Sequence, residues 1–192
     1  MKRISFFSAL VFLMLAGAWS VQADGVSSSK QGSIAVEFEN QTPCFFFGGY
    51  QLSAGMRYGP VRFRVSTQDS GEADFEDTGI DSRSGTFRRS YDDGSLSVSV
   101  DYFLSKHFFT YASLGSNRWL VQNKDTLATN HLRTLDAGLG LGFQTFIYKG
   151  LFVQLAAHVN VRERKSLIIQ GKEYTIPGMD YSPGLRVGYR FK

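Results

Sequence analysis

Apolar and polar residues alternate with a period of two through most of the chain beyond about residue 32. In one such segment Leu151, Val153 and Leu155 hold odd positions, whereas Gln154 and His158 hold even ones. Because successive side chains of a β-strand point to opposite faces, such a segment predicts a strand with one apolar and one polar face. No segment shows the 3.6-residue period of a helix between capping residues. The pattern therefore predicts an all-β fold.

The alternating segments predict eight strands. Three connections between them are tight, and the segments that flank each tight turn are expected to pair as hairpins. Tight turns at one rim and long polar loops at the other describe an eight-stranded antiparallel up-and-down β-barrel. The predicted strands are 32–39, 43–58, 61–69, 94–104, 107–121, 132–148, 150–165 and 181–192. The tight turns are 59–60, 105–107 and 149–150, and the long polar loops are 70–93, 122–131 and 166–180.

The polar face of these strands favours a transmembrane barrel over a soluble one. In a membrane barrel the apolar face meets lipid and the polar face lines the lumen. Here the polar face carries arginines together with acids, many Gly and Ser residues, and almost no lysine, which suits a narrow lumen filled by paired charges. The residues expected to form this lumen polar network are Glu37, Glu39, Arg57, Arg62, Arg64, Asp101, Asp136, His158, Arg162, Arg164, Arg186 and Arg190.

Aromatic residues gather beside the tight turns, as Tyr58, Phe108, Phe109 and Tyr148 do. Girdles of such rings lie at the interfaces of membrane barrels, whereas a soluble core gives no reason to collect them at one end. Eight strands leave no aqueous channel, so no open pore is expected. A soluble periplasmic barrel of the lipocalin type stays open as an alternative, because alternation alone does not say which face is buried.

The start of the chain has the pattern of a secretory signal peptide. A basic beginning precedes an apolar run over 4–19, and small residues stand at −3 and −1 of a cleavage site after Ala23. The run is shorter than the roughly 20 residues that a spanning helix needs. We therefore expect a signal peptide at 1–23, an outer-membrane β-barrel at 24–192, and a location in the cell outer membrane.

Composition excludes several other classes. The formal net charge of +4 is too small to indicate a nucleic-acid partner. Cys44 is the single cysteine, so an internal disulfide and a cysteine-rich metal site are excluded, and a free thiol is expected. No cofactor and no metal are expected. The mean hydropathy of −0.15 at first argues against a membrane protein. A value near zero is nevertheless expected for a membrane barrel, because half the residues of each strand face lipid and half face a polar lumen.

The final segment, 183–191, and the repeated short-turn hairpins carry a family resemblance. They resemble the small eight-stranded outer-membrane proteins of Gram-negative bacteria, such as the OmpX/Ail family, the OmpA transmembrane domain and the Opa-like surface antigens. The resemblance implies that Tyr189 and Phe191 form the C-terminal assembly signal read by the barrel-assembly machinery. It also implies contact with outer-membrane lipid and lipopolysaccharide. Lys192 departs from the family pattern, which usually ends on the aromatic residue.

The pattern and the resemblance together favour a monomeric barrel with a structural or surface-interaction role, in adhesion or envelope integrity. Loop 70–93 is the longest and most charged connection. Because binding residues concentrate on loops held by a rigid scaffold, this loop is the candidate contact for a host or surface ligand. A solvated loop that only keeps the surface polar is the alternative interpretation.

A lipid A-modifying enzyme of the deacylase or acyltransferase type is the competing hypothesis. Such an enzyme needs a nucleophilic serine, a histidine and an orienting acid close together. The best candidates are His158, Ser166 and Glu163. His158 and Ser166 stand eight residues apart on one predicted strand, which rises about 3.3 Å per residue, so they are not expected to touch. The sequence therefore favours a protein without catalytic activity.

Overall fold

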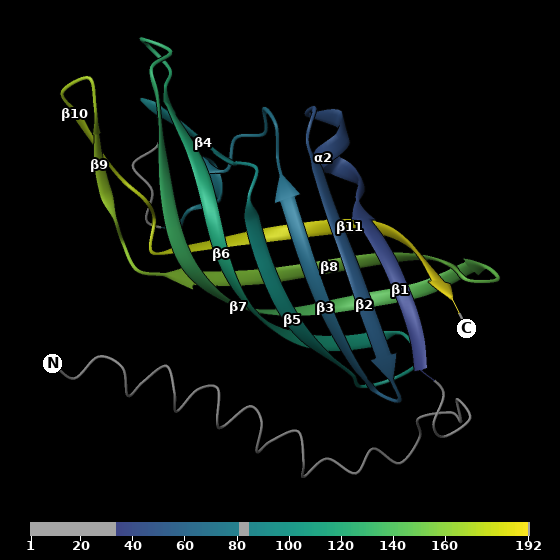
Figure 1. Ribbon diagram of the computed structural model, residues 1–192. Helices are drawn as coiled ribbons and strands as arrows, with labels where there is room; N and C mark the ends of the chain where they lie inside the picture. The colour runs from purple at the N-terminus through teal and green to yellow at the C-terminus, as the bar shows by residue number, and fades with distance from the viewer. Residues whose placement is uncertain (1–33, 81–84, 192) are drawn as a thin grey trace, which may run out of the picture.

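Eight long antiparallel strands form a closed barrel in the computed structural model, which describes residues 34–80 and 85–191 (Figure 1). The ring closes where β1 pairs with β11, as at Val36 opposite Phe191, and where β6 pairs with β7. The barrel strands are β1 (Ile34–Gln41), β2 (Tyr50–Tyr58), β3 (Val61–Asp69), β5 (Ser95–Phe103), β6 (Phe108–Asn123), β7 (Thr129–Tyr148), β8 (Leu151–Arg162) and β11 (Met179–Phe191). The predicted signal peptide at 1–23 and Lys192 lie outside the described residues.

The predicted eight-stranded antiparallel up-and-down barrel is confirmed. Each strand pairs with its neighbours in chain order once the short elements of the loops are set aside. The short turns after β2, β5 and β7 lie at one end of the barrel, which we call the tight-turn rim (Figure 1). The long connections lie at the opposite end, which we call the cap rim.

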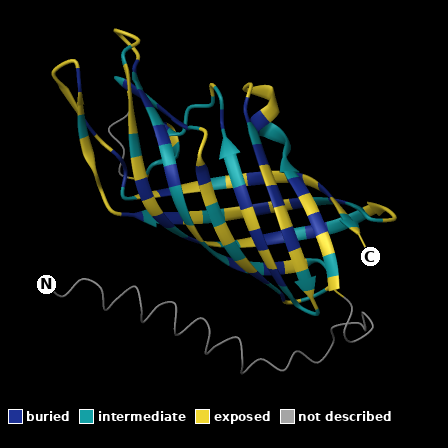
Figure 2. Ribbon diagram, viewed as in Figure 1, coloured by how far each residue is buried: buried dark blue, intermediate teal, exposed yellow. Residues whose placement is uncertain are grey.

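Exposure alternates along the barrel strands in the sense opposite to that of a soluble barrel (Figure 2). On β3, Arg62 is 0% exposed and Arg64 is buried, whereas Phe63 between them is 56% exposed. The same inversion puts large apolar side chains on the outside of every barrel strand. They include Phe38, Leu52, Phe63, Val98, Leu114, Leu141, Leu155 and Val187. The charged face therefore fills the interior and the apolar face covers the outer wall.

The second strand is shorter than the predicted 43–58, because it begins only at Tyr50. The preceding residues form a short helix, α2 (Thr42–Phe46). Pro43 stands in its first turn, where a fixed φ and a missing N–H are tolerated. Gly48 then adopts φ +73°, which ends the helix and turns the chain into β2. Within 34–80 and 85–191, no helix is long and apolar enough to span a membrane.

The long loops contain more regular structure than the sequence predicts. Loop 70–93 contains the turn η1 (Glu76–Thr78) and the strand β4 (Phe87–Tyr91). Loop 166–180 contains a hairpin of β9 (Ser166–Ile169) and β10 (Lys172–Thr175). β4 forms because it pairs with the part of β6 that extends beyond β5, which its local sequence does not reveal. The β9–β10 hairpin instead turns locally at Gln170 and Gly171, both with positive φ.

Strand ends at the cap rim also differ from the prediction. β7 begins at Thr129 and pairs with β6 as far as Gln122, so the predicted loop 122–131 shrinks to five residues, 124–128. β8 ends at Arg162 rather than 165, and β11 begins at Met179. Cross-strand pairing extends these strands or ends them, whatever their own alternation suggests.

Residues from the long loops and the outer ends of β6 and β7 build a second small core at the cap rim. We call this unit the cap; it consists of η1, β4, the β9–β10 hairpin and the ends of β6 and β7. Its elements lie together at one end of the barrel (Figure 1), and their buried apolar side chains pack against one another. They are Phe87, Tyr91, Trp119, Val121, Ile169, Tyr174 and Ile176.

Candidate functional site

The lumen is crossed by a layer of buried ion pairs, which we call the inner ionic cluster: Glu37, Glu39, Arg62, Arg64 and Asp101. Arg62 donates to Asp101 Oδ2 at 2.5 Å and to Glu37 Oε2 at 2.5 Å. Arg64 donates to Asp101 Oδ1 at 2.7 Å and also to Glu39. All five side chains are almost fully buried. Because each guanidinium bridges two carboxylates from different strands, the cluster ties β1, β3 and β5 together across the lumen.

Other arginines surround this cluster with different partners. Arg190 donates to Glu37 Oε1 at 2.5 Å. Arg57 lies toward the tight-turn rim, donates to the Gly59 carbonyl and lies 3.5 Å from the ring centroid of Phe103. Arg186 is buried, and its Nη1 lies 3.8 Å from a carboxylate oxygen of Glu39. The inner layer therefore contains arginines that differ in how well their charge is paired.

A second layer, the outer ionic cluster, lies nearer the cap and comprises Arg89, Asp136, Arg162 and Asp180. Arg162 Nη2 lies 2.8 Å from Asp136 and 2.7 Å from Asp180. Arg89 Nη2 donates to Asp180 at 3.2 Å. The Trp119 ring contacts the guanidinium groups of both Arg89 and Arg162, with centroid distances of 4.4 Å and 4.9 Å. Cation–π contacts of this kind stabilise a desolvated guanidinium, so the outer cluster joins the barrel to the core of the cap.

Between the two clusters lies a polar chamber of about 70 Å³. Its wall includes Tyr111, Asn117, His158, Ser182 and Arg186. His158 and Ser182 are directly opposed on β8 and β11. Ion-paired side chains of the two clusters fill the lumen on either side of this chamber.

Small residues leave room for the rings on the tight-turn side of the chamber. Gly140 and Gly142 on β7 lie directly against the rings of Tyr111 and Phe109, where an added Cβ would clash. Phe109 packs against Phe103 with ring centroids 5.0 Å apart. This apolar layer fills the lumen near the tight-turn rim.

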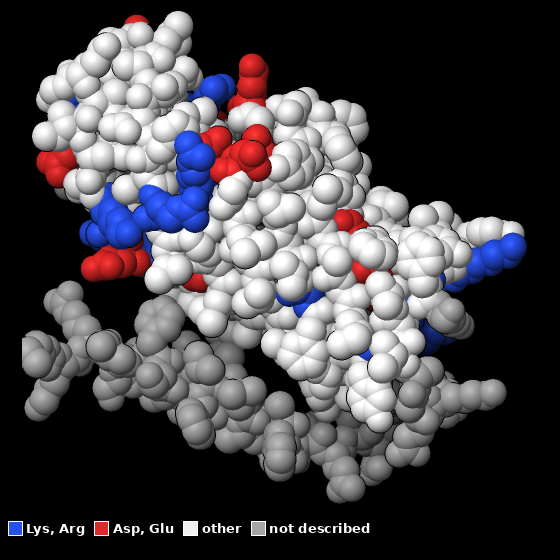
Figure 3. Space-filling model, in the orientation of Figure 1, with Lys and Arg blue, Asp and Glu red and all other residues white. Residues whose placement is uncertain are grey.

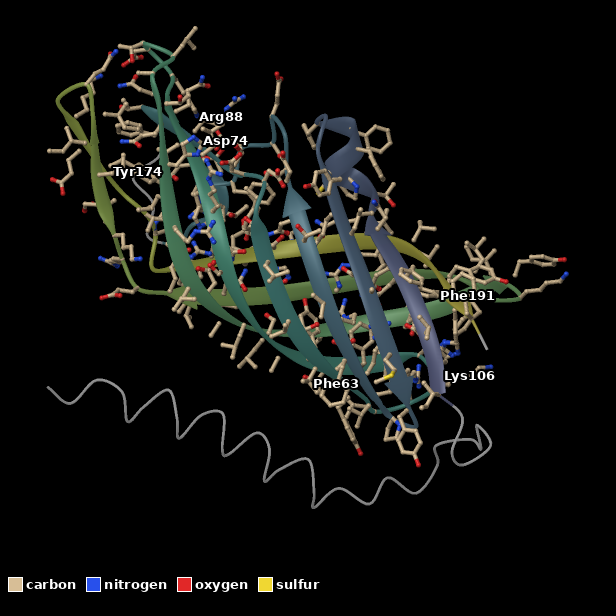
Figure 4. The ribbon with its side chains drawn as sticks, in the orientation of Figure 1. Phe63, Asp74, Arg88, Lys106, Tyr174 and Phe191 are labelled. Carbon is tan, nitrogen blue, oxygen red and sulfur yellow. The ribbon has the colours of Figure 1, made fainter. Side chains whose placement is uncertain are left out.

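Glu76 is the buried carboxyl group of the cap. It accepts a hydrogen bond of 2.7 Å from the hydroxyl of Tyr174, which lies in the cap end of the molecule (Figure 4). Arg89 Nε lies 4.0 Å away. Burial raises the pKa of Glu76 above its usual value of 4.5, although the Tyr174 hydrogen bond and the charge of Arg89 oppose the shift.

The cap should therefore become less stable as pH rises through the raised pKa of Glu76. A carboxyl whose folded pKa is raised contributes stability that is complete below its unfolded value of 4.5 and is lost above the folded value. Hydrogen exchange of cap amides should show greater protection at about pH 4 than at about pH 7. Glu76→Gln should flatten this difference. The exposed neighbour Asp77, changed to Asn, is the control, and equal pH dependence in both variants would contradict the role of Glu76.

The structure does not bring the catalytic candidates together. His158 lines the polar chamber, whereas Ser166 is exposed on β9 and its hydroxyl lies 2.7 Å from that of Thr175. Glu163 is exposed just beyond the end of β8. The β9–β10 hairpin carries Ser166 away from the lumen, which leaves no nucleophile–base pair among these three residues.

Most residues expected in the lumen lie there, but Arg164 does not. β8 ends at Arg162, and the chain leaves the barrel wall, so Arg164 is exposed near Gly178. Asp180 belongs to the outer cluster although no predicted strand contained it. Extending the even-numbered polar positions of the last strand backward from Ser182 would have found it. Arg89 had no such signal, because its place depends on the pairing of β4 with β6.

The charges of loop 70–93 are largely used within the molecule. Asp74 Oδ2 lies 3.0 Å from Lys124 Nζ, and its other oxygen accepts backbone hydrogen bonds from Glu76 and Arg89. Together with Arg88 and Tyr174 it belongs to the cap end, whereas Lys106 lies at the tight-turn rim (Figure 4). Cys44 is free and buried, as part of α2. Among the described residues, no group of three potential ligands is placed to hold a metal ion.

Comparison with solved structures finds several similar chains. The major outer membrane protein of Thermus thermophilus matches with 17% identity and a TM-score of 0.51, over 82% of this chain and 98% of that one. Neisserial surface protein A (NspA) matches with 16% identity and a TM-score of 0.47, over 83% and 96%. The N-terminal β-barrel domain of Pseudomonas aeruginosa OprF matches with 14% identity and a TM-score of 0.41, over 84% and 98%.

These similarities concern architecture. No family model matches the chain, and no curated protein sequence matches it significantly. The resemblance to small eight-stranded outer-membrane barrels, predicted from the hairpins and the last strand, is confirmed at the level of the fold. The chain thus has the fold of an eight-stranded outer-membrane β-barrel.

Proposed function

We propose that this protein spans the bacterial outer membrane, where a plugged barrel holds a folded cap at the cell surface. The observation that carries the proposal is the inverted exposure of the wall: Phe63 faces outward while Arg62 and Arg64 beside it are buried. In hydrocarbon, only helices and closed barrels satisfy every backbone polar group. A closed ring of strands with an apolar outer band meets that requirement.

Exposed aromatic side chains at the two rims support the proposal that the barrel spans a membrane. Aromatic side chains at the tight-turn rim, among them Tyr58, Phe108 and Tyr148, are more than half exposed. At the cap rim, Phe46 on α2 is 82% exposed beside the exposed Phe45. Rings at both ends of an apolar wall correspond to the two interfacial girdles of a membrane barrel. Because the short turns of outer-membrane barrels lie on the periplasmic side, the tight-turn rim would face the periplasm.

A barrel that spans a membrane should have few charged side chains on its outer wall and more at its two ends. On the face shown in Figure 3, charged side chains gather over the cap and at the opposite rim, with a mostly uncharged surface between them. The uncharged band would contact outer-membrane lipid, and the charged cap would lie among lipopolysaccharide headgroups. Tyr189 and Phe191, whose rings lie 4.7 Å apart on the outer wall, suit recognition by the barrel-assembly machinery.

The cap supports a surface-interaction role, in adhesion or envelope integrity. Its loops are held by their own apolar core and by the outer ionic cluster, rather than being solvated freely. A rigid scaffold presenting ordered loops is the arrangement in which binding residues usually occur. The ion-paired lumen supports a structural rather than a conducting barrel. A monomer suffices, because the ring closes within one chain.

Fractionation tests the membrane proposal directly. The full chain, expressed in a Gram-negative host, should be found with the outer membranes and stay in the pellet after washing with high salt and carbonate. A salt wash removes proteins held only by surface charge, so retention reports an apolar contact with lipid. Protease added to intact cells should cleave the cap and leave the barrel strands protected. Recovery as freely soluble periplasmic protein would refute the proposal and favour a lipocalin-like barrel.

A further inference from the structure

Arg186 is a buried arginine of the lumen whose charge is poorly paired. It is 6% exposed and lines the polar chamber between the two ionic clusters. Its Nε and Nη1 atoms have no hydrogen-bond partner among the described residues. The carboxylate atom Glu39 Oε1 lies 3.8 Å from Nη1, beyond hydrogen-bond distance, and accepts a hydrogen bond from Arg64. A buried guanidinium with unused donors is costly, so its environment needs a further acceptor.

The acids of the inner layer are already shared among other arginines. Glu39 Oε2 has no hydrogen-bond partner among the described residues, but it lies 3.9 Å from Arg62 Nη1. Three carboxylates, those of Glu37, Glu39 and Asp101, already accept hydrogen bonds from Arg62, Arg64 and Arg190. Arg57 and Arg186 come in addition, so five arginines face three acids and the layer carries a formal excess of two positive charges. Arg57 lies toward the tight-turn rim and is more exposed. Arg186, by contrast, is buried.

The chamber in front of Arg186 has neutral acceptors, among them Gln51 Oε1 and Asn117 Oδ1, which lack a hydrogen-bond partner among the described residues. The carboxylate in its wall, that of Asp136, has other partners. The Tyr111 hydroxyl and His158 Nδ1 have no hydrogen-bond partner among residues 34–80 and 85–191. Asp136, on the cap side, is already bound by Arg162, Asn117 and Thr134. The volume of about 70 Å³ exceeds the roughly 10–15 Å³ that one water requires. It accommodates a small ion together with water.

We propose that the chamber is a binding site for a small monovalent anion of the size of chloride, held by the Arg186 guanidinium with help from Tyr111 and His158. The anion would neutralise a buried arginine that lacks a close carboxylate among the described residues, and it would complete the packing between the two ionic clusters. The site is buried within the lumen, so the anion would serve as a bound structural component and not as a transported solute.

Crystals of the full-length mature protein, purified in detergent and grown with sodium bromide as the probe, test the site. The bromide anomalous map should show a peak in contact with Arg186 inside the chamber. In solution, bromide should raise the melting temperature more than gluconate does at equal ionic strength, because an anion that binds only the folded state stabilises it. Arg186→Gln should abolish both signals. Arg190→Gln, which loses a different lumen arginine, should retain both.

Two results would overturn the proposal. One is a wild-type chamber that contains water only, with no bromide peak at Arg186. The other is an Arg186→Gln protein that keeps the bromide peak or the bromide-specific rise in melting temperature. The wild-type map decides the question even where Arg186→Gln fails to fold. The outcome is independent of the fractionation result, since the chamber lies inside the barrel whatever surrounds its wall.

Discussion

Replacing Arg62 by Met should lower the free energy of unfolding by about 3–5 kcal/mol, the range measured when one partner of a buried ion pair is removed. Arg62 is completely buried and bridges Glu37 and Asp101, and it also donates to Gln154 at 2.9 Å. Methionine retains most of the length of the side chain but removes one of the two arginines that bind each carboxylate, because Asp101 keeps only Arg64 and Glu37 keeps only Arg190. Urea-induced unfolding in phospholipid vesicles, followed by tryptophan fluorescence, measures the change.

Two further variants separate charge pairing from simple loss of an arginine. Arg133→Met removes an exposed arginine that donates to Ser116 and should change stability by no more than about 0.5 kcal/mol. Arg62→Met combined with Asp101→Asn should cost less than the sum of the two single substitutions, because both singles remove the same Arg62–Asp101 contact. If Arg62→Met matches Arg133→Met, the inner ionic cluster does not hold the barrel together.

Replacing Leu139 by Arg should impair insertion and lower stability in lipid by about 2–4 kcal/mol, the cost of an arginine at the bilayer midplane. Leu139 is 40% exposed on the outer wall, where it lies opposite Ala112 of β6 on one side and Val159 of β8 on the other. Its side chain points away from the lumen, so the new guanidinium would find no acidic partner inside. Folding yield in vesicles and unfolding in urea measure the effect.

Ile168→Arg provides the matched control for Leu139→Arg. Ile168 is 69% exposed on β9 of the cap, beyond the proposed lipid band. An arginine at this position would be solvated by water and should change the free energy of unfolding by no more than about 0.5 kcal/mol. Equal losses from the two substitutions would show that the outer wall does not contact lipid. A loss confined to Leu139→Arg supports the orientation of the wall.

The inside and outside of the barrel could be predicted because side chains alternate strictly along a strand. Once Phe63 is assigned to one face, Arg62 and Arg64 must lie on the other. The same rule assigns Glu37 and Glu39 to the lumen, where both are buried. It assigns Arg186 there too. Each of these assignments needs only the sequence of a single strand.

The contacts within the cap could not be predicted in that way. Glu76, Arg89 and Tyr174 come from three elements of two loops, and they meet because β4 pairs with β6 while the β9–β10 hairpin packs against the same core. The apolar residues of these loops do not alternate over a strand's length, so the period-two pattern predicts no strand there. Pairing across the fold, not local propensity, decides such segments.

For this protein, the sequence alone determined the strand class, the number of barrel strands and the face on which each charge of a barrel strand lies, because a period of two is a local property. Only the tertiary structure decided which charges meet. Arg62 forms hydrogen bonds with Glu37 and Asp101, whereas Arg186 has no close carboxylate among the described residues. Those pairings depend on how eight strands close and stagger around one lumen, and no strand carries that information by itself.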